Sequence, residues 1–326
     1  MAHLSRRLFT ALVGAGLACP VLPAAAQAAQ WPTKPVRWIV PFAPGGPGDV
    51  TGRMVAQKLS ELWGQQVLVD NKAGANTVIG AVEGARAAPD GYTLFQPMNS
   101  TLTINQFALS RTPYDSLRDF THIGVMASVP LLVVANDTLP AKTIPELIAL
   151  AKRQPGTITV GGGNIGQQLA VERFVRDSGT QVRYIPYKSG ADVTKALLSG
   201  EIQVGFDGVP AYPQFIKSGR LRALATNSPT RISLLPDVPA LAEFGLKNSE
   251  APIWHALVAP AGLPADIRNK IARDVQTVLA MPDIKERMAT LGLEPTWMPA
   301  DDFVRLIRSE SATMGSIVKD LGIKLD

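Results

Sequence analysis

Short β-rich runs alternate with helical patterns along most of the chain, and this alternation limits the accessible folds more than any other feature. Residues 36–40 predict a strand, and apolar residues then recur at helical spacing over 50–62. Strands at 67–69 and 92–95 follow, with a helical stretch near 78–87 between them. This order is typical of a parallel sheet covered by helices.

A second set of the same kind begins with the apolar run 129–135. Thr143 and Glu146 form a capping-box pattern that predicts a helix over 145–153. The later strands are expected at 158–160, 182–187, 202–206 and 221–226, with helices from about 167, 193 and 212 between them. Beyond residue 254 the pattern changes to long helices, 265–280 and 300–321, which we expect to pack back on the first set.

Two α/β units in one chain predict a clamshell of two lobes, each with a sheet flanked by helices. Because the C-terminal helices return to the first unit, the chain would cross the hinge twice. We place the crossings at 127–130 and 250–253. The predicted lobes are therefore 29–128 with 252–326, and 129–251.

Residues 1–28 have the parts of a secretory signal peptide. Arg6 and Arg7 precede an apolar run too short to span a bilayer, and small residues then predict cleavage near Ala26 or Ala28. Residues 5–9 also partly match a twin-arginine signal, so general secretion and twin-arginine export both stay open. We expect a periplasmic mature protein.

Cleavage removes Cys19, the only cysteine, which excludes disulfides and cysteine-based sites from the mature chain. It also lowers the net charge from +5 to +3, because two of the 32 basic residues are lost against 27 acidic ones. No Lys/Arg cluster is present, so nucleic acid is not an expected partner. The mild positive balance suits an anionic solute.

Ligands of open α/β sheets bind at the carboxyl ends of the strands, so the turns there carry the candidate residues. Residues 41–49 combine prolines and glycines with Asp49 as a cap, and the helix start behind them offers N–H groups to an anion. Such turns are also rich in glycine and proline for geometry alone, and the pattern leaves both explanations open. The next two turns add the short polar residues Asn76, Thr77, Asn99 and Ser100.

In the second unit, Gly161, Gly163 and Gly166 match the dinucleotide-binding pattern G-x-G-x-x-G. That pattern also needs an acid about 20 residues later, where this chain has Pro-Tyr-Lys at 186–188. We therefore expect no cofactor, and explain the glycines by a helix start that holds a carboxylate. Tyr187 and Asp207 end two further strands of this unit.

Catalytic motifs are missing from the sequence. It has neither G-x-S-x-G nor H-E-x-x-H, and only His122 and His255 remain after signal removal. We expect His122 just before a strand and His255 inside one, both in structural roles. Asp49 and Asp207 could form a carboxylate pair for glycoside chemistry, but a cap and a ligand contact explain them more simply. We predict neither catalysis nor a metal site.

At these turns the chain resembles the Bug family, the extracytoplasmic receptors of tripartite tricarboxylate transporters. The resemblance extends over essentially the whole mature chain. It rests on the segments 31–35, 41–49, 69–75, 88–94, 186–188 and 235–239.

The resemblance implies a type II-like periplasmic-binding-protein fold, or Venus flytrap, with two mixed sheets. Such a receptor closes on a carboxylated solute and delivers it to a permease with a large and a small integral subunit. The binding residues that it implies are Phe42, Ala43, Gly46, Asp49, Ala75, Asn76, Thr77, Gly163, Asn164, Gly166, Gln167 and Asp207. Gln167 and Gln168 stand where relatives commonly carry Ser and then His, so we expect Gln167 and its neighbours to choose the solute.

These observations predict a monomeric solute-binding protein for a small aliphatic or aromatic mono- or dicarboxylate. A receptor that presents its ligand to a sensor kinase is the alternative, and an exported hydrolase is a more distant one. The identity of the carboxylate is open.

Overall fold

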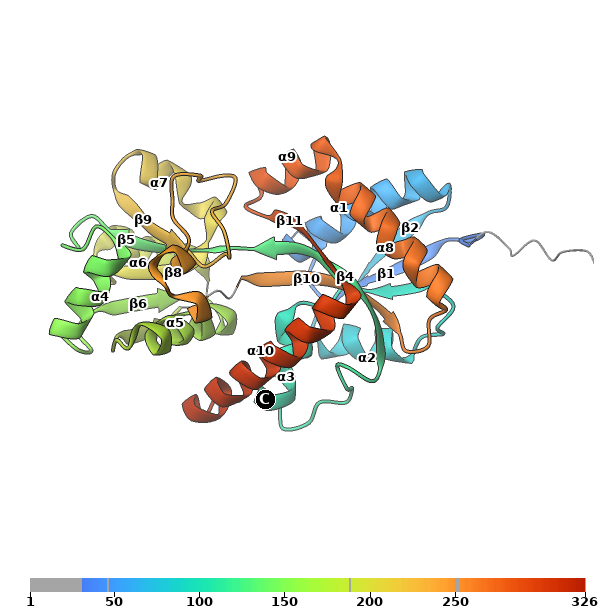
Figure 1. The fold of residues 1–326 in the computed structure, drawn as a ribbon, viewed down its shortest axis with the longest axis horizontal. Helices are drawn as coiled ribbons and strands as arrows, with labels where there is room; N and C mark the ends of the chain where they lie inside the picture. The colour runs from blue at the N-terminus through green and yellow to red at the C-terminus, as the bar shows by residue number, and fades with distance from the viewer. Residues whose placement is uncertain (1–30, 46, 188, 250–251, 326) are drawn as a thin grey trace, which may run out of the picture.

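The computed structural model describes residues 31–45, 47–187, 189–249 and 252–325, which form two α/β lobes side by side (Figure 1). Each lobe contains one mixed sheet with helices against it, as predicted. The predicted signal peptide, 1–28, lies outside the described residues. No described helix has both the length and the apolar character that crossing a membrane requires.

The first lobe is built on a six-stranded sheet of order β11-β4-β10-β3-β1-β2. β1 pairs in parallel with β2 and β3, as the strand–helix alternation predicts, whereas β10 and β11 run antiparallel to β4. Its strands are β1 (Val36–Val40), β2 (Val67–Asn71), β3 (Thr93–Phe95), β4 (Phe120–Val129), β10 (Ile253–Pro260) and β11 (Glu294–Pro299). Its helices are α1 (Pro47–Trp63), α2 (Val78–Arg86), α3 (Asn105–Ala108), α8 (Ala265–Ala280), α9 (Pro282–Thr290) and α10 (Ala300–Leu321).

Apolar cores cover both faces of this sheet. Trp38 and Ile39 are adjacent in β1 and fully buried on opposite faces, as the two-residue period of a strand requires. Trp38 packs with α1 and α8, and Ile39 packs with α2 and α10. The C-terminal helices α8 and α10 therefore pack on the two faces of this sheet.

The second lobe has a five-stranded sheet of order β7-β6-β8-β5-β9. β6 is parallel to β7 and β8, and β5 is antiparallel to β8 and β9. The strands are β5 (Leu131–Asn136), β6 (Thr159–Gly162), β7 (Arg183–Pro186), β8 (Val204–Gly208) and β9 (Leu221–Thr226). The helices are α4 (Ile144–Arg153), α5 (Ile165–Ser178), α6 (Gly190–Ser199) and α7 (Pro213–Lys217).

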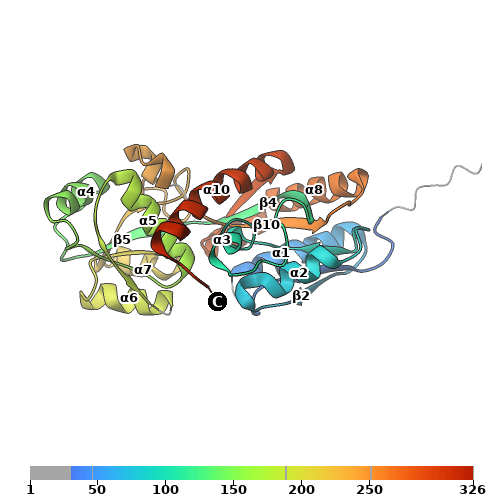
Figure 2. The ribbon, with the colours of Figure 1, turned by 90° about the horizontal axis from the view of Figure 1, so that it is seen from below.

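Two segments join the sheets. β4 and β5 are almost continuous, and only Pro130, which lacks an N–H for a ladder bond, separates them. The chain returns between the short helix η5 (Lys247–Ser249) and β10. The end of α10 also reaches α5 (Figure 2), where Asp320 pairs with Arg176 at 3.0 Å.

Two sequence predictions were wrong in this region. His122 does not precede a strand but lies inside β4, and the run expected at 129–135 is the end of β4 followed by β5. Polar residues and Gly124 interrupt the apolar pattern of β4, so its start gave no clear signal. The short elements α3, α9 and β11 were also not predicted.

Candidate functional site

Asp49 braces the turn that follows β1. It lies in the first turn of α1, is 2 % exposed, and accepts hydrogen bonds from Gly45 N and Asn71 Nδ2, both at 2.8 Å. Arg53 Nε donates a third bond at 3.0 Å. Burial raises the pKa of Asp49, but the bonds from Arg53, Gly45 and Asn71 outweigh it and hold the pKa below its usual range. Its charge therefore stabilises the turn itself.

Phe42 is held in the same turn by close packing. Asn71 Nδ2 donates to Phe42 O at 2.9 Å, and a Cβ on Gly48 would lie 2.3 Å from Phe42 Cδ2. The Phe42 ring centroid lies 5.8 Å from that of His255, a fully buried side chain whose pKa burial lowers to about 4. Ala43 is exposed beside it, and Gly46 lies outside the described residues.

The second turn, η1 (Ala75–Thr77), has an unusual backbone. Ala75, Asn76 and Thr77 all have left-handed φ angles of 44°, 50° and 74°, which residues with a Cβ seldom adopt. Thr77 Oγ1 shares a 2.7 Å hydrogen bond with Thr101 Oγ1. Within the described part of the chain, the N–H groups of Ala75 and Asn76 have no acceptor. The turn thus presents unused donors just before α2.

The third turn belongs to the same lobe. Asn99 Oδ1 accepts a hydrogen bond from Ser100 N at 3.0 Å and so caps η2 (Ser100–Ile104). Thr101, next to Ser100, shares a hydrogen bond with Thr77 of the second turn. The structure therefore brings the predicted residues Thr77, Asn99 and Ser100 into one region.

In the second lobe, Gln167 folds back over the start of its own helix. Asn164 caps α5 by accepting a bond from Gln167 N at 3.0 Å. The Gln167 side chain accepts from Gly163 N through Oε1 and donates to Asp207 Oδ1 at 2.6 Å through Nε2. A neutral amide therefore occupies the helix start at which the sequence predicted a bound carboxylate.

Asp207 is a buried acid at the end of β8. Tyr212 OH donates to its Oδ2 at 2.8 Å, and no described Lys or Arg pairs with it. Burial raises its pKa, although bonds from Gly208, Tyr212 and Gln167 oppose that effect. This side chain is held by dipoles and not by a counter-charge.

Close packing explains two glycines of this lobe, Gly163 against backbone and Gly190 against the Asp207 side chain. A Cβ on Gly163 would lie 2.6 Å from Ser189 C, and one on Gly190 would lie 2.7 Å from Asp207 Oδ2. Gly166 is half-buried near Ile253 at the hinge. Tyr187 lies at the end of β7, and its hydroxyl donates to Glu201 at 2.8 Å.

Sequence reasoning did not assign roles to several residues of these turns. Gln96 donates to Gly48 O at 2.7 Å and accepts from Trp38 Nε1 at 2.9 Å, which joins the first turn to β1 and β3. Its position directly after an apolar strand is a sequence signal for such a role. Asn71 reaches Phe42 and Asp49 through contacts that depend on strand order, whereas Tyr212 bonds to Asp207 in the segment directly before it.

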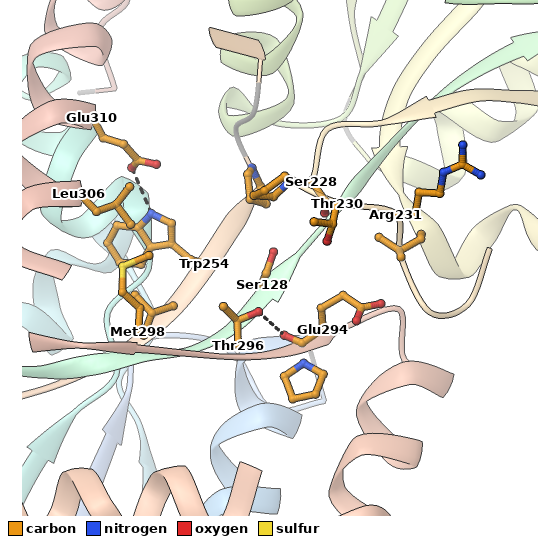
Figure 3. A pocket seen from close by; sticks show the side chains of 15 residues that line it. Ser128, Ser228, Thr230, Arg231, Trp254, Glu294, Thr296, Met298, Leu306 and Glu310 are labelled. Atoms are coloured by element: carbon orange, nitrogen blue, oxygen red, sulfur yellow. Dashed lines mark hydrogen bonds between the residues drawn. The ribbon is translucent and has the colours of Figure 1, made fainter. Parts of the chain in front are cut away.

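A separate cavity of about 460 Å³ lies where the lobes meet (Figure 3). Its walls come from β4, β10, β11 and α10 and from residues 228–232 of the second lobe, and no predicted site residue lines it. Glu310 accepts from Trp254 Nε1 at 3.1 Å, and burial raises the pKa of Glu310 to about 7. Ser128 and Ser228 also line it, and their hydroxyls have no partner among the described residues.

Two α/β lobes joined by two strand connections, with glycine-rich strand-end turns on both, define a solute-binding receptor of the periplasmic-binding-protein fold. A family model described as the tripartite tricarboxylate transporter family receptor matches residues 51–323. The chain belongs to this family, and the resemblance read from its turns is confirmed.

Individual relatives agree with this assignment. The chain is 34% identical to the protein BugT of Bordetella pertussis over 314 residues, which cover 95% of each chain. Among solved structures, it is similar to the periplasmic binding protein BugD, with 31% identity, a TM-score of 0.67, and coverage of 90% of this chain and 99% of that one. An R. palustris protein solved with adipate gives 29% identity, a TM-score of 0.71, and coverage of 90% and 99%.

Proposed function

We propose that this protein is a periplasmic receptor that captures a small carboxylate between its lobes for a tripartite tricarboxylate transporter. The observation that carries the proposal is the second turn, where the N–H groups of Ala75 and Asn76 are unused just before α2. Free N–H groups at a helix start favour an anion through hydrogen bonds and the helix dipole. The neighbouring turn, with Phe42, Ala43 and Gly46, would hold the same carboxylate.

Asp49 supports this site indirectly. Because its charge is already paired within the turn, it would not repel an incoming carboxylate as strongly as a free acid would. Its role in the proposal is to keep Phe42 and the glycines of the first turn in position.

Gln167 is the residue that we expect to select the solute. Its Oε1 accepts from Gly163 N, and a carboxylate oxygen is chemically able to take its place there. The remaining proposed contacts with the far end of the solute are Asn99, Ser100, Asn164, Gly166, Tyr187 and Asp207.

Capture in this proposal involves closure about the hinge segments 127–130 and 250–253, between lobes 29–128 with 252–326 and 129–251. A solute that touches both lobes stabilises the closed state because it gains contacts there that the open state lacks. No cofactor and no covalent step are needed, so the protein acts as a receptor and not as an enzyme.

The similarity to BugD and to the adipate-bound protein supports a periplasmic location and a carboxylate ligand. We propose that the signal peptide 1–28 is removed near Ala26 or Ala28 and that the mature chain works as a monomer. Its partners would be the large and small membrane subunits of the transporter.

A thermal-shift screen of the mature protein tests this function. The panel contains aliphatic and aromatic mono- and dicarboxylates, adipate included, with uncharged matched compounds such as adipamide and 1,6-hexanediol. We expect at least one carboxylate to raise the Tm while its uncharged counterpart does not, because binding to the folded state alone stabilises it. If no carboxylate raises the Tm at millimolar concentration, the proposal is wrong.

A further inference from the structure

The C-terminal tail lies against the second turn of the binding site. Leu325 O accepts a hydrogen bond from Asn76 Nδ2 at 3.2 Å, although 249 positions separate the two residues. Leu325 N donates to Ala108 O at 2.8 Å, at the end of α3. Ile323 and Leu325 also pack against the apolar cluster that contains Ile104 and Ala108. The tail is thus anchored on the first lobe and touches the turn from outside.

The turn needs such external support. Three consecutive non-glycine residues, Ala75 to Thr77, lie in the left-handed region, which is disfavoured for each of them by the Cβ atom. A backbone of this kind persists only where the surroundings over-determine it. If the turn relaxed, the two unused N–H groups would change direction.

A second group of contacts holds the turn from inside the lobe. Asn105, which is fully buried, donates from Nδ2 to Asn76 O at 2.7 Å. Thr77 Oγ1 bonds to Thr101 Oγ1, and Tyr114 OH donates to Thr101 O at 2.6 Å. Asn76 is therefore held by two hydrogen bonds. Its carbonyl accepts one from Asn105, and its side chain donates the other to Leu325 O of the tail.

We propose that the C-terminal tail is a latch that keeps the turn 75–77 in its left-handed, carboxylate-binding form, with Asn105 as a second positioning residue. The inference rests on the proposed function in one respect, namely that this turn binds the carboxylate. The tail leaves α10 at Gly322, and α10 also contacts α5 of the second lobe through Asp320 and Arg176. The latch therefore lies close to the region where the two lobes meet.

The test uses the full mature chain and three changes. Removal of 323–326 deletes the latch, Leu325→Pro keeps the length but removes the N–H that bonds to Ala108 O, and Asn105→Ala removes the inner contact. Lys324→Ala is the matched control because its side chain is exposed and the tail backbone is kept. The proline variant decides the outcome if the truncated chain does not fold.

The first readout is amide exchange at Val78 in the ligand-free protein. Val78 N donates to Ala75 O, a bond that depends on the form of the turn. We expect exchange to become at least about tenfold faster in the three latch variants, with wild-type rates in Lys324→Ala and in β5 and β8 of the second lobe. Wild-type exchange at Val78 in both tail variants, the truncation of 323–326 and Leu325→Pro, would overturn the latch, whatever Asn105→Ala does.

The second readout is the Kd for adipate, measured by calorimetry. We expect it to rise about tenfold or more in the latch variants and to stay unchanged in Lys324→Ala. Faster exchange with an unchanged Kd would overturn the positioning role. If adipate and the other carboxylates of the screen bind to no variant, including the wild type, while Val78 exchange responds as expected, the proposed function fails and the latch stands as a structural element.

Discussion

Gln167 Nε2 donates a hydrogen bond to Asp207 Oδ1 over 2.6 Å and thereby links the start of α5 to the end of β8. Both side chains are buried, and the other amide atom of Gln167 accepts from Gly163 N. One neutral side chain therefore bonds to a buried acid and to a backbone donor at the same time, and Gly208 N and Tyr212 OH complete the bonds to the acid. This arrangement explains how an acid can lie in the proposed cleft without a basic partner among the described residues.

Replacement of Gln167 by Ala leaves Gly163 N without its acceptor and removes one of the donors to Asp207, which keeps its bonds from Gly208 N and Tyr212 OH. We expect the free energy of unfolding to fall by about 1–3 kcal/mol, the range for an unsatisfied buried polar group. Gln168→Ala, on the neighbouring and less buried position, is the control and should change it by less than about 1 kcal/mol. Urea unfolding of the wild type, Gln167→Ala and Gln168→Ala measures these free energies. Equal losses in both variants would contradict the role given to Gln167.

Asp49→Asn tests the brace of the first turn. The Asp49 carboxylate accepts three hydrogen bonds, whereas the amide of Asn would turn its own N–H₂ group toward some of the same donors. We therefore expect the free energy of unfolding to fall by about 2 kcal/mol or more at pH 7, and carboxylate binding to weaken. Because the folded pKa lies below the usual value of 3.8, the stability contributed by the charge is present above that pH and disappears as the pH falls below it.

The measurement is therefore the stability difference between wild type and Asp49→Asn at pH 7 and at about pH 3. The difference should shrink in acid. Asp137→Asn, at an exposed position, provides the control and should show little effect at either pH. A difference that stayed constant with pH would mean that the Asp49 charge does not stabilise the turn.

Gly163→Ala tests the close approach of two backbones in the second lobe. A Cβ there would meet Ser189 C at 2.6 Å and Gly190 N at 2.8 Å, and backbone atoms cannot rotate away as a side chain can. We expect a loss of about 1–3 kcal/mol in stability together with weaker carboxylate binding. Gly208→Ala is the matched control, because a Cβ there would meet no atom closer than 3.9 Å and the φ of −62° suits alanine. Similar Tm values for the two variants would refute this packing argument.

Glu310 should make stability depend on pH near neutrality. Burial raises its pKa to about 7, although Trp254, Arg173 and Thr103 act in the opposite direction. A folded carboxyl with a raised pKa binds a proton that the unfolded chain releases, so the folded state loses stability as the pH rises from about 4.5 to about 7. Glu310→Gln removes this titration.

We therefore expect the free energy of unfolding of Glu310→Gln, relative to that of the wild type, to rise by roughly 2–3 kcal/mol between pH 5 and pH 8. Denaturant unfolding at both pH values measures the gain, and Glu286→Gln, at an exposed position, is the control. Parallel pH profiles for wild type and Glu310→Gln would show that Glu310 is charged throughout.

Local patterns were enough to predict the two-lobed fold and the strand-end turns. The prolines and glycines of 41–49 restrict the backbone wherever the rest of the chain lies, and the amphipathic period of α8 and α10 reports which face is buried. β4 was found only in part because His122 and Gly124 interrupt its apolar run.

The contacts within the turns could not be predicted in the same way. Asn71 reaches Asp49 only because β1 and β2 are neighbours in register, and Asn76 meets Leu325 only after α10 has folded back over the first lobe. Gln167 gave a signal as a departure from the family pattern, but its fold-back onto Gly163 depends on the position of Asp207 in another strand. Such roles follow from tertiary structure.

The central claim is that a carboxylate binds between the turns of both lobes, and a crystal structure at saturating carboxylate tests it most directly. We predict a carboxylate within hydrogen-bond distance of the N–H groups in 42–49 or 75–77, with the rest of the molecule in contact with 163–167. A molecule bound to one lobe alone, or in the cavity beside Trp254 and Glu310, would contradict the account.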